Sequence, residues 1–165
     1  MHKDTLWPTH KATLYPMLEK QLLALVEDCP PVSALANASS LLWEALTDIN
    51  WVGFYLRKDE MLHLGPFQGK TACTLIPIGR GVCGTSAATR EIQLVKDVHQ
   101  FTGHIACDSA SNSEIVLPLI KNGILLGVMD IDSPVFSRFD EDDAFGLQVL
   151  CQVLIKHVDW SNGLL

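Results

Sequence analysis

The sequence lacks clusters of basic residues and long apolar runs. Its 165 residues contain 12 Lys+Arg against 19 Asp+Glu, which gives a net charge of −7 at pH 7. Proteins that bind nucleic acid neutralise several phosphates with clustered Lys and Arg, so we expect no nucleic-acid partner. The longest apolar stretches, 115–120 and 124–129, are much shorter than the ~20 residues that cross a bilayer. We therefore expect no membrane span.

The N-terminus also lacks the pattern of a secretory signal. Residues 1–8, MHKDTLWP, have neither a basic start nor an apolar run, which favours a cytoplasmic location. Charged residues make up only 19% of the chain, whereas hydrophobic residues reach 48%. Disordered chains combine low hydrophobicity with high net charge, so this chain is expected to fold. Its length suits one compact domain over residues 1–165.

Cysteine occurs in an odd number and without the spacing of a metal site. The five are Cys29, Cys73, Cys83, Cys107 and Cys151. Cytosolic thiols stay reduced unless they are catalytic or redox-sensing, so a structural disulfide framework is disfavoured. No C-x-x-C or H-x-x-x-H pair is present, and a zinc site built from His99, His104, Cys107 and Asp108 is not expected.

Hydrophobic periodicity predicts helices at both ends of the chain. Apolar residues recur every three or four positions over 11–28 and over 33–48, as one face of a helix requires. A closing helix is expected over 140–158, because the carboxylates of 140–143 suit the positive end of its dipole.

Between these helices, aromatic and β-branched residues predict about six strands. They are expected over the ranges 51–56, 61–64, 73–78, 92–98, 114–120 and 124–132. A glycine-rich segment, 79–84, is expected to lead into a short helix over 85–90. Hairpin connections without βαβ alternation indicate an α+β fold with an antiparallel sheet and flanking helices.

Three acidic residues, Glu114, Asp130 and Asp132, stand in strands that are otherwise apolar, where a buried carboxylate is costly unless it is paired or protonated. A two-residue turn would pair position 114 with 131 and place Glu114 on the face opposite to the aspartates. A three-residue turn with Gly123 in a bulge would pair 114 with 130 and bring all three to one face. There the three carboxylates could hold an ammonium group, and a carboxyl group that is kept protonated could donate its proton. A solvated face is the alternative.

Three of the cysteines lie in segments rich in small residues, which are typical of loops that carry reactive groups. Cys107 belongs to the aperiodic stretch 100–113. Cys83 stands in GRGVCG, where backbone N–H groups at a helix start could bind an anion, although a tight turn explains the glycines equally well. Cys29 and Cys151 are interpreted as buried or incidental thiols.

Longer strings carry a more specific signal. The chain closely resembles the GAF-domain free methionine-(R)-sulfoxide reductases in NWVGFYL (50–56), LGPFQGK (64–70), AC (72–73), GVCGTSA (81–87), VKDVHQF (95–101), GHIACDSASNSEIVLPL (103–119) and GVMDIDSP (127–134). Three cysteines at intervals of 10 and 24 residues are typical of this family rather than of GAF domains at large.

The resemblance implies a single GAF domain that reduces the R epimer of free methionine sulfoxide, not protein-bound residues. Electrons would come from thioredoxin and ultimately from NADPH, with no bound cofactor or metal, in a cytosolic homodimer. It also implies that Cys107 is the nucleophile, Cys73 the main resolving thiol and Cys83 a second thiol that resolves or relays. Thr102 departs from the family, where a proline is expected, but this change removes no reacting group.

The resemblance further implies which residues surround the substrate: Trp51, Tyr55, Val82, Cys83, Glu114, Asp130 and Asp132. Of these, Glu114 or Asp132 would protonate the departing oxygen. Two other functions remain open, namely a GAF module that binds a small ligand without turnover and a thiol redox sensor that acts through a partner.

Overall fold

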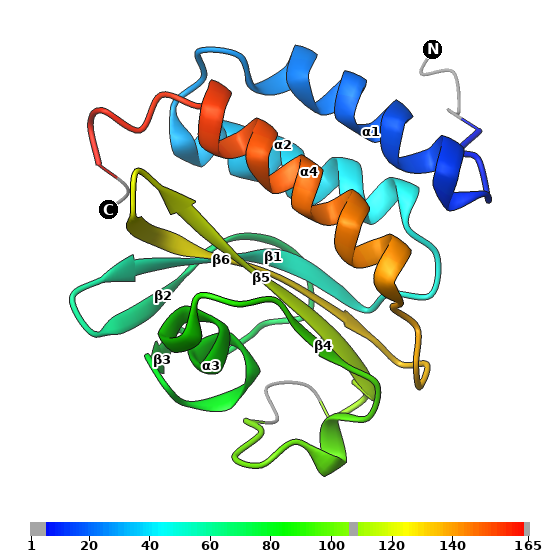
Figure 1. The fold of residues 1–165 in the computed structure, drawn as a ribbon, viewed down its shortest axis with the longest axis vertical. Helices are drawn as coiled ribbons and strands as arrows, with labels where there is room; N and C mark the ends of the chain where they lie inside the picture. The colour runs from blue at the N-terminus through cyan, green and yellow to red at the C-terminus, as the bar shows by residue number, and fades with distance from the viewer. Residues whose placement is uncertain (1–5, 106–108, 164–165) are drawn as a thin grey trace.

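The computed structural model describes residues 6–105 and 109–163. A six-stranded antiparallel sheet with helices on both faces (Figure 1) confirms the expected single α+β domain. The elements are α1 (Lys11–Val26), α2 (Pro31–Ala45), β1 (Trp51–Lys58), β2 (Met61–Gly69), β3 (Leu75–Pro77), α3 (Gly81–Thr89), β4 (Gln93–Val95), η1 (Val98–Gln100, a 3₁₀ turn), β5 (Ser113–Lys121), β6 (Ile124–Ser133) and α4 (Glu141–His157). None of the described helices is long and apolar enough to cross a membrane.

The two faces of the sheet have different partners. The strand order is β3-β2-β1-β6-β5-β4, so β1 and β6 lie at the centre. Figure 1 shows α1, α2 and α4 together over one face and α3 alone over the other, which we call the site face. Side chains alternate between the faces along each strand. In β1, Val52 and Phe54 pack under the three helices, whereas Trp51 and Tyr55 belong to the smaller core under α3.

The start of α3 differs from the prediction. The helix begins at Gly81 rather than at residue 85, so the glycine-rich segment forms its first turn instead of leading into it. Its N-cap is Arg80, which makes no capping hydrogen bond with its side chain. Without a Ser, Thr, Asp or Asn at this position, the sequence carried no start signal. The expected strand over 92–98 is likewise reduced to β4 by the turn η1.

The β5–β6 hairpin has a register that neither predicted turn would give. Its turn is the two-residue type, with Asn122 (φ 51°) and Gly123 (φ 78°) between a paired Lys121 and Ile124. The register then shifts between Leu119 and Ile120, and position 114 pairs with 132. Both predicted pairings, 114 with 131 and 114 with 130, are therefore wrong. The three carboxylates nevertheless lie on one face, as predicted. The register shift is a β-bulge, which changes the strand pairing by one residue.

A buried carboxylate connects α1 to α4. The Asp143 side chain is only 1% exposed. Lys11 Nζ donates to its Oδ2 at 2.7 Å, and the Tyr15 hydroxyl donates to its Oδ1 at 2.7 Å. Arg138 Nη1 lies 3.5 Å from the same Oδ2. Two cations and a hydroxyl thus compensate a charge whose burial would otherwise be costly.

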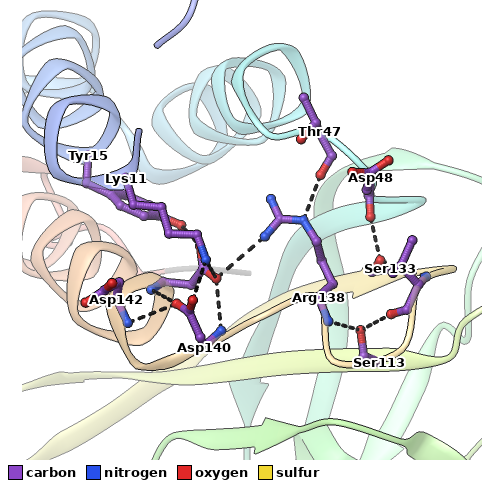
Figure 2. A network of polar contacts seen from close by, with 11 residues as sticks. Lys11, Tyr15, Thr47, Asp48, Ser113, Ser133, Arg138, Asp140 and Asp142 are labelled. Atoms are coloured by element: carbon purple, nitrogen blue, oxygen red, sulfur yellow. Dashed lines mark hydrogen bonds and ion pairs between the residues drawn. The ribbon is translucent and has the colours of Figure 1, made fainter. Parts of the chain in front are cut away.

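Arg138 extends this network to the end of the sheet. Its Nε donates to the Thr47 carbonyl at 2.9 Å, and its backbone N–H donates to Ser113 Oγ at 3.3 Å (Figure 2). Ser113 pairs with Ser133 at the ends of β5 and β6, and the Ser133 hydroxyl donates to the Asp48 carbonyl. The helical side of the molecule therefore fixes the strand ends directly beside positions 114 and 132.

Candidate active site

A pocket lies between the site face of the sheet and α3. Strands β1, β5 and β6 contribute its acidic and aromatic residues, α3 contributes its first turn, and loop residues complete it. The lining residues are Trp51, Tyr55, Thr71, Ala72, Ile76, Arg80, Gly81, Val82, Cys83, His104, Ile105, Ser111, Glu114, Asp130 and Asp132.

Three of these residues form one row across the strands. Trp51 of β1 lies opposite Asp132 of β6, and Asp132 lies opposite Glu114 of β5. Two positions earlier on β6, Asp130 lies opposite Gly53. A Cβ added at Gly53 would be 2.4 Å from a side-chain carbon of β2, so the close approach requires glycine. The ladder therefore brings three carboxylates to one pocket.

Trp51 and Tyr55 form an aromatic wall. Their rings stack with centroids 5.9 Å apart, and Phe67 stacks with Trp51 at 5.2 Å. Trp51 Nε1 donates to the Lys70 carbonyl at 3.1 Å, and the Tyr55 hydroxyl donates to the Cys73 carbonyl at 2.9 Å. Strand β1 thereby fixes the segment that carries Cys73.

Cys83 enters the pocket from the first turn of α3. The turn packs closely because Gly84 has no side chain, and an added Cβ there would be 2.6 Å from the Pro77 carbonyl oxygen. Cys83 is 5% exposed, and its Sγ lies 4.0 Å from Glu114 Oε1. The first backbone N–H groups of a helix have no helical carbonyl partner, so this end of α3 can bind an anion.

Burial controls the acid–base properties of the pocket. It raises the pKa of Glu114 well above its usual value, and the charges of Asp130 and Asp132 raise it further. Burial also raises the pKa of Asp130, but hydrogen bonds with Glu114 and Cys83 oppose that rise. Burial and the neighbouring carboxylates therefore favour the protonated form of Glu114. Burial and the same carboxylates raise the pKa of the Cys83 thiol, which stays protonated.

His104 lies at the edge of this acidic group. Its Nε2 is 3.8 Å from Glu114 Oε2. Burial and the nearby His99 lower the pKa of His104, so its imidazole is neutral at neutral pH. The contact is therefore one between a neutral ring and a carboxyl group whose protonated form is favoured, and the ring keeps a nitrogen that can bind a proton or a metal ion.

The structure brings together all the predicted substrate-binding residues, which are Trp51, Tyr55, Val82, Cys83, Glu114, Asp130 and Asp132. Cys73 lies beside the pocket, since its neighbour Ala72 lines it. Cys107 lies outside the described residues, but Ile105 and Ser111, which precede and follow it in the chain, both line the pocket. The chemical roles assigned to these residues remain predictions.

Several lining residues were not predicted from the sequence, among them Thr71, Ala72, Ile76, Arg80, His104, Ile105 and Ser111. Arg80 could have been found, because it directly precedes the glycine-rich helix start and an exposed cation there suits an anion site. The others are ordinary loop or strand residues, and only the tertiary fold brings them to the pocket.

Three comparisons with known proteins agree with this geometry. The GAF domain family matches residues 33–154. A free methionine-R-sulfoxide reductase from Escherichia coli (strain K12) is 54% identical over 148 residues, which cover 89% of this chain and 90% of that protein. A protein of the same name from Saccharomyces cerevisiae (strain S288c) is 50% identical over 133 residues, which cover 76% of this chain and 74% of that protein.

A solved structure extends the likeness to three dimensions. The X-ray structure of the free methionine-R-sulfoxide reductase from Neisseria meningitidis in complex with its substrate matches with a TM-score of 0.91 and 42% identity, and the match covers 98% of each chain. The sequence matches show the family, and the structural match shows the fold. This chain is a GAF-domain protein and belongs to the family of the free methionine-R-sulfoxide reductases, which are oxidoreductases.

Proposed function

We propose that this protein reduces free methionine-(R)-sulfoxide to methionine and uses its own thiols as the reductant. The observation that carries the proposal is a pocket in which Glu114, whose pKa is raised by burial, lies beside two further carboxylates, a thiol and an aromatic wall. High identity to reductases of this name supports the same assignment.

Each group of the substrate has a partner in the pocket. The carboxylates of Asp130 and Asp132 bind the α-ammonium, and the N–H groups at the start of α3 bind the α-carboxylate. The stacked rings of Trp51 and Tyr55 pack against the substrate side chain. An internal residue of a peptide has neither charged group, so the pocket selects the free amino acid.

The first chemical step transfers the sulfoxide oxygen away from the substrate. The Cys107 thiolate attacks the sulfoxide sulfur while Glu114 donates a proton to the oxygen, with Asp132 as the alternative acid. The hydroxyl group then passes to the Cys107 sulfur as the sulfur–oxygen bond of the substrate breaks. The bond between the two sulfur atoms breaks as well, and methionine leaves with its sulfur reduced by two electrons. Cys107 is oxidised to a sulfenic acid in the same step.

Cys73 is the better candidate for the second thiol. Tyr55 holds its carbonyl beside the pocket, whereas the raised pKa of the buried Cys83 makes that thiol a weak nucleophile. Condensation of the Cys73 thiol with the sulfenic acid forms a disulfide and releases water. Thioredoxin then reduces the disulfide by thiol–disulfide exchange, with electrons from NADPH and without a bound cofactor.

We also propose a cytoplasmic homodimer. A reducing compartment keeps the reacting thiols available between turnovers. The groove between α1 and α4, lined by Pro16 and Phe145, is the proposed dimer surface, because Phe145 is 72% exposed and large exposed apolar groups often mark contacts. Sedimentation of the natural protein and of Phe145→Asp tests this point, and an unchanged monomer in both would contradict it.

Thioredoxin-coupled oxidation of NADPH tests the proposed activity. The substrates are the free R epimer, the free S epimer and a peptide that contains the sulfoxide. We expect turnover of the free R epimer only, its loss in Cys107→Ser and its retention in Cys29→Ser. Failure to turn over either epimer, with a small ligand still bound, would instead support a sensory GAF module. Oxidation of the thiols by peroxide without sulfoxide turnover would support a redox sensor.

A further inference from the structure

Three metal-binding atoms from three elements converge in the pocket. One atom each of Cys83 (α3), Glu114 (β5) and Asp130 (β6) lie within 4.8 Å of one another, and all three residues are buried. The thiol Sγ is 4.0 Å from Glu114 Oε1. A thiol and two carboxylates in this arrangement are a donor set for a metal ion as well as a surface for a substrate ammonium.

A second observation independently points to a missing ligand. Asp130 is 5% exposed, and its Oδ1 has no hydrogen-bond partner among the residues that the structure describes. Buried acceptors are nearly always satisfied by protein or by a bound group. Because Asp130 lines the pocket, the group that would satisfy this oxygen has to come from the pocket itself.

The charges of the pocket require that group to be positive. In the described part of the chain, neither Glu114 nor Asp130 forms an ion pair with Lys or Arg. Among the described residues, the basic group within 4.0 Å of Glu114 is the ring of His104, at 3.8 Å, and that ring is neutral at neutral pH. Each carboxylate that ionises therefore adds an uncompensated negative charge in a buried site.

The types of donor atom favour Zn²⁺ over harder cations. Mg²⁺ and Ca²⁺ prefer oxygen ligands only, whereas Zn²⁺ combines thiolate, imidazole and carboxylate in a tetrahedron. Bond lengths of ~2.3 Å to sulfur and ~2.0 Å to oxygen place tetrahedral donors about 3.5 Å apart. The separation of 4.0 Å between Cys83 and Glu114 closes to this value with small side-chain rotations.

We propose that Cys83, Glu114 and Asp130 supply three ligands of a reversible Zn²⁺ site in the reduced protein. Binding of Zn²⁺ releases the thiol proton of Cys83 and the carboxyl proton of Glu114 to solvent, and it satisfies the open oxygen of Asp130. The same atoms then cannot hold the substrate, so Zn²⁺ inhibits by competition. The competition rests on the proposed function, whereas metal binding itself does not.

Titration of the reduced full-length protein with Co²⁺ tests the site without any assay of turnover. A tetrahedral site with one thiolate is expected to give a sulfur-to-cobalt charge-transfer band, which Zn²⁺ then displaces. Cys83→Ser should abolish the band, and Asp130→Asn should weaken Co²⁺ binding by roughly 100-fold. Cys151→Ser is the matched control, since Cys151 is a buried free thiol elsewhere in the fold, on α4.

Circular dichroism establishes whether each variant is folded. If Cys83→Ser does not fold, Glu114→Gln serves as the second probe, because it preserves the shape of the side chain. A charge-transfer band that persists in folded Cys83→Ser overturns the site. Absence of any band in a protein that turns over sulfoxide overturns the site while leaving the proposed function intact.

Added free R epimer should displace Co²⁺, and Zn²⁺ should raise KM without changing kcat. If either of these two results is not obtained, the proposed competitive inhibition is overturned.

Discussion

Glu114 lies directly opposite Asp132 in the β5–β6 ladder, although the turn of this hairpin alone would place it opposite Ile131. The extra residue is Leu126, because Leu119 pairs with Gly127 whereas Ile120 pairs with Leu125. A shift of one residue exchanges the two faces of a strand. This bulge is therefore what puts Asp130 and Asp132 on the same face as Glu114.

Loss of the acidic proton at position 114 should impair the chemical step. Glu114→Gln keeps the shape of the side chain but removes the acid, so we expect kcat to fall by ~10²–10³-fold, as for other general acids. The measurement is steady-state kinetics with free methionine-(R)-sulfoxide. Glu44→Gln, a change at an exposed glutamate of α2, is the control and should leave kcat unchanged. A nearly normal kcat in Glu114→Gln would transfer the role of acid to Asp132.

Removal of the proposed resolving thiol should separate the two halves of the reaction. Cys73→Ser should still release one methionine per chain, because the nucleophile is present, but it should then stop at the sulfenic acid. Chromatographic measurement of methionine and dimedone labelling of the protein test this outcome. Sustained turnover by Cys73→Ser would show that Cys83 resolves the sulfenic acid instead.

The hydroxyl of Tyr55 should affect the rate of disulfide formation rather than the rate of methionine release. Tyr55→Phe removes the hydrogen bond to the Cys73 carbonyl, whose usual contribution to stability is about 1 kcal/mol. We expect disulfide formation to slow severalfold while the rate of methionine release in the first turnover is unchanged.

The control for this change is the other tyrosine of the chain. Tyr15→Phe removes a comparable hydrogen bond, to Asp143 in the helical layer, and should lower stability without slowing disulfide formation. Equal effects of both changes on resolution would mean that the Tyr55 hydroxyl acts only through overall stability. Stopped-flow measurements with acid quenching distinguish the two cases.

The lowered pKa of Asp140 predicts that the stability of the protein depends on pH. Its hydrogen bond with Lys11 lowers the pKa of this carboxyl from 3.8 to about 2. Because the folded pKa is the lower one, the stabilisation is complete above about pH 4 and is lost as pH falls from about 4 to about 2. The side chain is 57% exposed, so solvent screening limits the effect to ~0.5 kcal/mol.

Asp140→Asn isolates this charge, since asparagine is also a good N-cap for α4. Urea unfolding should give a variant less stable than the natural protein by ~0.5 kcal/mol near neutral pH, and the two should converge towards pH 2. A difference that stays constant over this range would mean that the ion pair with Lys11 contributes nothing.

The sequence allowed the faces of the strands to be predicted better than their register. A strand was expected over 51–56, and the period-two alternation of any strand there places Trp51 and Tyr55 on one face and Val52 and Phe54 on the other, whatever the strand pairing. The bulge at Leu126 carries no local signal, because leucine is an ordinary strand residue. Both predicted pairings failed for that reason.

Long-range polar contacts were equally invisible in the sequence. Asp143 was interpreted only as a favourable charge at the start of a helix, yet it is buried and bonded to Lys11, 132 positions away. The anchoring of Ser113 by Arg138 depends in the same way on how the helical layer meets the sheet. Such contacts follow from tertiary packing and have no periodic or local pattern.

The stoichiometry of a single turnover distinguishes reduction of the sulfoxide by the protein's own thiols from binding without reaction. The fully reduced protein is mixed with an excess of free methionine-(R)-sulfoxide and no external reductant, and methionine, free thiols and disulfides are counted. We expect one methionine per chain, the loss of two thiols and a disulfide that peptide mapping assigns to Cys73 and Cys107. Bound sulfoxide with no methionine formed and all thiols still free would contradict this expectation.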